Sequence, residues 1–108
     1  MNGYQITFFT QQDRHHKHKP LAEWLMLAAR DIGVHGATIV TGSEGYGHHR
    51  CIHSARFFEL ADQPQEVVMA VSEEESLQLF EFLKAEGVHL FYVKTPVEFG
   101  VLGEPERN

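Results

Sequence analysis

The chain has 108 residues, 43% of them hydrophobic and eight of them phenylalanine, so it can bury a single core and is not an intrinsically disordered protein. Its formal net charge of −6 excludes general nucleic-acid binding, which needs a basic surface. A single cysteine, Cys51, excludes an intramolecular disulfide, and no apolar run reaches the roughly 20 residues that cross a bilayer. With no visible export signal, we expect one cytoplasmic domain over residues 1–108.

The first part of the sequence predicts a strand, a helix and a second strand. Tyr4–Thr10 is rich in aromatic and β-branched residues, as strands are, and the polar residues 11–19 predict a loop. Pro20 suits the first turn of a helix, and Gly33 is a typical helix end. Between them, apolar residues recur at helical spacing at Leu21, Trp24, Leu25, Ala28 and Ile32. Residues 37–41 (ATIVT) then predict a strand, because they are mostly β-branched.

Three further extended segments are predicted in the second half. Residues 55–60 (ARFFEL) resemble a short strand or an arm. Residues 65–71 are apolar on both faces, which is typical of a central strand. Residues 88–95 predict the last strand, and Pro96 is expected to interrupt it.

A second helix is predicted between the last two strands. Ser72 and Glu75 have the spacing of a capping box, in which each side chain binds the other residue's backbone amide. The acidic residues 73–75 also favour the positive end of a helix dipole, so they indicate a helix start and not a catalytic cluster. Gly87 is the expected end of this helix.

This order of elements, β-α-β-(arm)-β-α-β, predicts an α+β protein. We expect a ferredoxin-like βαββαβ sandwich, with two helices on one face of an antiparallel sheet. Adjacent apolar residues in the strands, such as Phe8 with Phe9 and Phe91 with Tyr92, point to opposite faces, so both faces of the sheet are apolar. Two helices cover only one face. The other face therefore predicts an oligomer packed sheet to sheet.

The richest stretch for a functional site runs from Gly33 to His53, which combines a helix end, a strand, a glycine loop and potential ligands. Gly42, Gly45 and Gly47 can present backbone amides to an anion. Their spacing matches neither the dinucleotide fingerprint nor a phosphate-binding P-loop, so a flexible turn between strands is the alternative.

The end of the same stretch is a candidate metal site. If it is extended, His49, Cys51 and His53 share one face, with Cα atoms about 6.7 Å apart in steps of two. Imidazole and thiolate together suit zinc or copper, whereas the alternative is a solvated loop. Cys51 lacks a recognisable orienting group for nucleophilic chemistry, so no enzyme is predicted. The histidines within residues 15–18 more simply belong to a solvated loop than to a second metal or pH-sensing cluster.

The glycine stretch carries a resemblance to a known family. GVHGATIVTGSEGYG is similar to the helix end, second strand and T-loop entrance of PII-like signalling proteins. The chain more closely resembles the DUF190 branch of that superfamily. The matching residues are Asp13-Arg14, Lys19-Pro20-Leu21, Gly36 to Val40, Gly42, Glu44 to Gly47 and Ile52-His53.

The resemblance implies a non-enzymatic regulatory protein that forms a homotrimer, with sheets facing a central axis. A small anionic effector, with an adenine nucleotide as the leading candidate, is expected in clefts between subunits near the 42–50 loop. The longer loop, residues 43–56, is expected to regulate a membrane transporter or an enzyme. The motif match puts Thr38 at a base-contacting position. It puts Gly45, Tyr46 and Gly47 at the phosphate side.

Two phosphate-binding elements of the better-known PII proteins have no counterpart here. Residues 84–88 (KAEGV) replace a longer glycine- and lysine-rich loop, and the segment after the last strand lacks an Arg-x-Arg pair. Arg14, Lys19 and Arg50 are the cations that remain for an anionic effector. Two other functions stay open, namely a metal-binding protein of the copper-tolerance type and an interaction module that binds no ligand.

Overall fold

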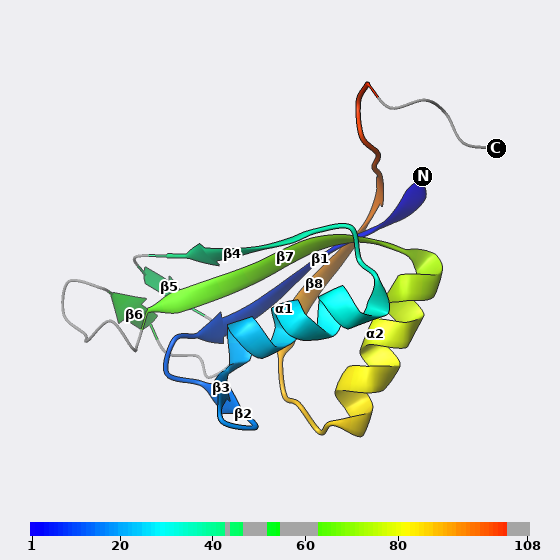
Figure 1. Ribbon diagram of the computed structural model, residues 1–108. Helices are drawn as coiled ribbons and strands as arrows, with labels where there is room; N and C mark the ends of the chain where they lie inside the picture. Colours follow the sequence, from blue (N-terminus) through cyan, green and yellow to red (C-terminus); the bar gives the residue numbers. More distant parts are fainter. Residues whose placement is uncertain (43, 47–51, 55–62, 104–108) are drawn as a thin grey trace.

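The computed structural model describes residues 1–42, 44–46, 52–54 and 63–103 (Figure 1). Its two helices are α1 (Leu21–Ile32) and α2 (Glu73–Ala85). Its strands are β1 (Asn2–Gln11), β2 (His15–His16), β3 (Lys19–Pro20), β4 (Ala37–Thr41), β5 (Glu44–Tyr46), β6 (Ile52–Ser54), β7 (Pro64–Ser72) and β8 (Phe91–Glu98). Among these described elements, neither helix has the length and apolar character needed to cross a membrane.

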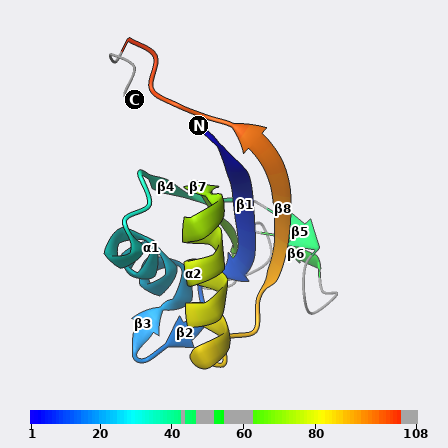
Figure 2. The same cartoon turned by 90° about the vertical axis from the view of Figure 1, so that its right-hand side faces the viewer.

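The main sheet has four strands in the order β4-β7-β1-β8, and every neighbouring pair is antiparallel. Figure 2 shows both helices on the same side of this sheet. This is the predicted ferredoxin-like α+β arrangement. The segment predicted as a central strand is β7, which lies between β4 and β1.

The core lies between the helices and one face of the sheet. Burial alternates along β1 and β7, because successive strand residues point to opposite faces. The buried side chains of these strands are Ile6, Phe8, Thr10, Val67, Met69 and Val71, and the helices add Leu21, Trp24, Leu25, Leu79 and Leu83. The apolar stripe predicted for the first helix therefore packs on the sheet.

The predicted helix ends are confirmed. Ser72 Oγ accepts a hydrogen bond from the Glu75 amide at 3.1 Å, and Glu75 Oε1 accepts one from the Ser72 amide at 2.8 Å. Gly33 ends α1 in the left-handed conformation at φ 96°, and Gly87 follows the end of α2 at φ 70°. Glycine adopts this conformation without the steric cost that a Cβ atom imposes.

The segment predicted as a loop at residues 11–19 contains a short hairpin, in which β2 pairs with β3. Its two connecting residues, Lys17 and His18, have positive φ values of 50° and 67°. Such two-residue connections usually carry Asn or Gly, so this hairpin has no local sequence signal. Pro20 belongs to β3 and is the N-cap residue of α1, so it precedes the first turn instead of lying in it.

The prediction that Pro96 interrupts the last strand is wrong. β8 begins at Phe91, three residues later than predicted, and it continues through Pro96, which lies opposite Tyr4 of β1. Proline is tolerated here because β8 is an edge strand, where one side needs no backbone donor. The strand or arm predicted at residues 55–60 lies outside the described residues.

Candidate functional site

The sheet face opposite the helices, here called the second face, carries both apolar and polar side chains. Strand pairing aligns Val40, Glu66, Phe9 and Phe91 in one row across the sheet, and Thr38, Val68, Thr7 and Val93 in the next. Phe91, Val93 and Val40 are 48%, 46% and 45% exposed. The Phe9 and Phe91 rings lie 5.4 Å apart and tilted, so they form one aromatic surface. The second face therefore carries apolar side chains, as predicted, together with the polar residues Glu66 and Thr7.

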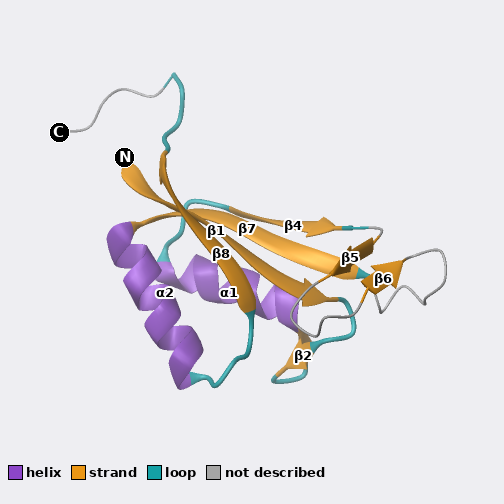
Figure 3. Cartoon of the chain, turned by 180° about the vertical axis from the view of Figure 1, so that it is seen from behind, coloured by secondary structure: helices purple, strands orange, loops and turns teal. Residues whose placement is uncertain are grey.

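The glycine stretch leaves the sheet at the end of the edge strand β4. The Gly42 amide donates to the Pro64 carbonyl at 2.8 Å, which ties the start of the stretch to β7. Beyond it, β5 and β6 form an antiparallel pair in which Gly45 lies opposite His53. Figure 3 shows this pair beyond the end of the four-stranded sheet, on the side away from α2. The base of the predicted loop is thus a short hairpin.

The structure places part of the predicted effector site on this edge. Thr38 is exposed on β4 and lies opposite Val68, so it belongs to the second face. Gly45 and Tyr46 are in β5, which follows β4 along the chain. Gly47 and Arg50 fall outside the described residues.

The predicted metal ligands are not brought together in the described part of the chain. The backbone of His53 is in β6, whereas His49 and Cys51 lie outside the described residues. No group of three His, Cys, Asp or Glu side chains in the described ranges has the geometry to hold a metal ion. His15, His16 and His18 are described and likewise form no such group.

The other two predicted cations lie at the β2–β3 hairpin, Arg14 just before β2 and Lys19 within β3. Arg14 Nη2 donates to the His89 carbonyl at 2.8 Å, in the segment that leads into β8. Lys19 is exposed in β3. Because β4 and β8 are opposite edges of the sheet, one chain does not bring Arg14 beside Thr38.

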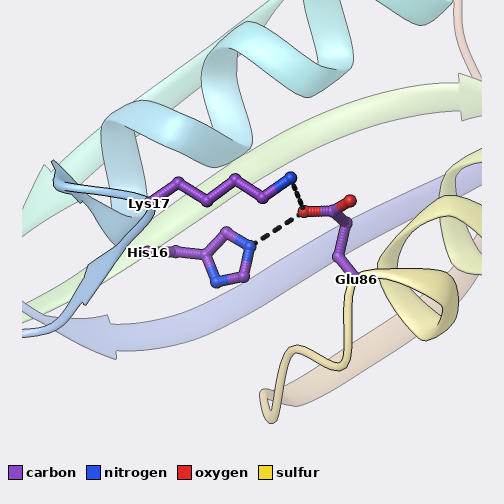
Figure 4. A network of polar contacts seen from close by, with 3 residues as sticks. All are labelled: His16, Lys17 and Glu86. Carbon is purple, nitrogen blue, oxygen red and sulfur yellow. Dashed lines mark hydrogen bonds and ion pairs between the residues drawn. The ribbon is translucent and has the colours of Figure 1, made fainter.

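A polar cluster that the sequence did not reveal joins this hairpin to the end of α2 (Figure 4). Glu86 Oε1 lies 3.0 Å from His16 Nε2 and 2.8 Å from Lys17 Nζ. The hydrogen bond from His16, followed by that from Lys17, lowers the pKa of the Glu86 carboxyl below its usual value. The His16 ring also packs edge-on against Trp24 at 4.3 Å. The cluster fixes the hairpin to the helix layer.

Solved structures of other proteins share this fold. A protein from Thermus thermophilus, assigned as a PII-like signalling protein, is 17% identical and has a TM-score of 0.64 over 89% of this chain and 87% of that one. CPII from Thiomonas intermedia K12, solved with ADP, AMP and acetate, is 22% identical, with a TM-score of 0.58 over 93% and 90% of the chains. The same protein with ADP, AMP and bicarbonate is 24% identical, with a TM-score of 0.56 over 90% and 89%. The chain has a PII-like fold.

Sequence comparison gives the family. The model of DUF190, described as "Uncharacterized ACR, COG1993", matches residues 3–90. A UPF0166 protein of Aquifex aeolicus (strain VF5) is 31% identical over 75 residues, which cover 69% of this chain and 71% of that protein. The chain belongs to the DUF190 family, as the glycine motif predicted.

Proposed function

We propose that this chain is a non-enzymatic, PII-like regulatory protein of the cytoplasm. It assembles into a homotrimer through the second face and binds a small anionic effector in clefts between subunits. The first candidate effector is an adenine nucleotide. The 43–56 loop then transmits the bound state to a membrane transporter or an enzyme.

The observation that carries the proposal is the exposed second face. Phe91, Val93 and Val40 spread from one edge strand of the sheet to the other. Exposed apolar side chains gathered on one sheet face, here interrupted by Glu66 and Thr7, mark an interaction site, and sheets commonly cover such faces by packing on other sheets. Burying it between copies of the chain removes it from water, which is the main favourable term in association.

The strand order supports clefts that two subunits share. In a closed ring of identical head-to-tail contacts, unlike surfaces meet, so the β4 edge of one subunit faces the β8 edge of the next. The β4 edge carries Thr38 and the start of the glycine stretch. The β8 edge carries Arg14, held at the His89 carbonyl. The ring would therefore bring together residues that a single chain keeps apart.

The effector class rests on the chemistry of these residues. Backbone amides at Gly45 and Gly47 suit an anion, and Arg14, Lys19 and Arg50 are cations available to neutralise it. The CPII structures contain ADP and AMP, which supports testing adenine nucleotides first. No observation in the described ranges favours the metal-binding alternative, so it serves as the competing outcome of the test.

Isothermal titration calorimetry of ADP, AMP and Zn²⁺ into the full-length chain tests the proposal. A nucleotide should bind the wild type and should not bind Gly47→Val, because Cβ blocks both the glycine conformations and the close approach of backbone to phosphate. The His49→Ala/His53→Ala variant should bind the nucleotide like the wild type. Tight zinc binding that disappears in the double variant, with no nucleotide binding, would overturn the effector proposal.

A further inference from the structure

A cavity of about 320 Å³ opens on the helix side of the sheet, where α2 passes beside β8. It is separate from the glycine stretch, because β8 and β4 are opposite edges of the sheet. Its lining residues are Phe8, Phe80, Leu83, Lys84, Val88, Leu90, Tyr92 and Lys94. Six of these are apolar or aromatic, none is acidic, and two are lysines.

One wall of the cavity is a cluster of three aromatic rings. Phe80 lies 4.8 Å from Tyr92 in an edge-on arrangement and 5.9 Å from Phe8. Phe8 is buried and anchors the cluster in the core, whereas Tyr92 is 47% exposed. Aromatic rings favour stacked or edge-on partners, so the open side of this cluster suits a flat ring.

The two lysines give the cavity a positive charge. Lys94 Nζ lies 4.1 Å from the centre of the Tyr4 ring and 5.4 Å from that of Phe80, so aromatic faces hold the ammonium in place. Lys84 is in the last turn of α2. In the part of the chain that the structure describes, neither lysine pairs with a carboxylate. In a chain with a net charge of −6, two such cations at one apolar cavity favour an anionic ligand.

We propose that this cavity is a binding site for a small anion that carries a flat aromatic ring. The ring packs against Phe80 and Tyr92, and the anionic group lies between the ammonium groups of Lys84 and Lys94. An aromatic carboxylate and a nucleoside monophosphate both have this chemistry. All of its lining residues come from one chain, so the site does not need a second subunit to form.

Backbone-amide NMR titration of the full-length chain tests the site with naphthalene-2-carboxylate as the probe. The amide signals of residues 83–94 should shift on addition of the acid. The neutral naphthalene-2-carboxamide should bind more weakly, because it offers the same ring without the charge. In Lys84→Gln/Lys94→Gln, the Kd of the acid should rise about a hundredfold, about tenfold for each of the two lost charge-assisted contacts. The Kd of the amide should stay the same.

Three controls make the result specific. Lys94→Arg keeps the charge and should keep the affinity, and Arg30→Gln removes an exposed cation from the last turn of α1 and should have no effect. Gly47→Val should bind the acid normally even where it loses nucleotide, which separates the two sites. A parallel titration with AMP chooses between the two sources of the anion.

The site would be overturned by any of three results. The first is that no amide signal shifts at millimolar naphthalene-2-carboxylate. The second is that the acid and the amide bind with equal affinity. The third is that the Kd of the acid is unchanged in Lys84→Gln/Lys94→Gln.

Discussion

Replacing Phe91 with serine should dissociate the proposed trimer. Phe91 lies on the second face, beside Phe9, and is 48% exposed in the single chain. A phenylalanine side chain has about 200 Å² of surface, so burying its exposed half removes about 100 Å² from water. At about 25 cal/mol per Å², this burial contributes about 2.5 kcal/mol per subunit. Loss of the ring should then weaken association about seventyfold for each subunit.

Sedimentation equilibrium over a range of protein concentrations measures this change. The matched control is Leu77→Ser, which removes an apolar side chain that is 61% exposed on α2, in the helix layer and away from the second face. Circular dichroism should show that both variants keep their fold. The reasoning fails if Phe91→Ser associates like the wild type, or if Leu77→Ser dissociates equally.

Three predictions concern the stability of the subunit. Gly3→Ala should lower the free energy of unfolding, measured by chemical denaturation, by about 1–3 kcal/mol, because a Cβ would collide with the Val71 carbonyl oxygen. The control is Gly100→Ala, whose Cβ would meet nothing within 4 Å and whose stability should stay near that of the wild type. Ser72→Ala should cost about 1 kcal/mol through loss of the capping box, and a variant as stable as wild type would contradict this. The pKa of Glu86 is lowered in the folded state, so the contacts of its charged carboxylate stabilise the fold. This stabilisation is fully present above pH 4.5, the usual pKa of the group, and is lost as the pH falls through the lower pKa of the folded state. The Tm advantage of wild type over Glu86→Gln should therefore shrink on acidification below that value, and an advantage independent of pH would refute the assignment.

Local chemistry made much of the fold predictable. The capping box at Ser72 and the left-handed glycine at Gly33 are decided within a few residues, and both were found as expected. The two apolar faces followed from adjacent residues such as Phe91 and Tyr92, since neighbouring strand residues must point apart. The family followed from the glycine motif.

Features set by distant parts of the chain were not predictable. The β2–β3 hairpin turns at Lys17 and His18, which carry no turn signal, and it is held by Glu86, about 70 residues away. The continuation of β8 through Pro96 depends on its place at the sheet edge, which no local pattern reveals. The cavity beside Lys94 likewise arises only when α2 packs next to β8.

Native mass spectrometry of the full-length chain with ADP tests the central claim most directly, because it reports assembly and ligand together. The proposed function predicts a complex of three times the 12.3 kDa chain mass, with one nucleotide per cleft. The Phe91→Ser variant should yield mainly single chains without nucleotide. A wild-type chain that stays at 12.3 kDa at micromolar concentration, or a trimer that takes up no nucleotide, would contradict the account.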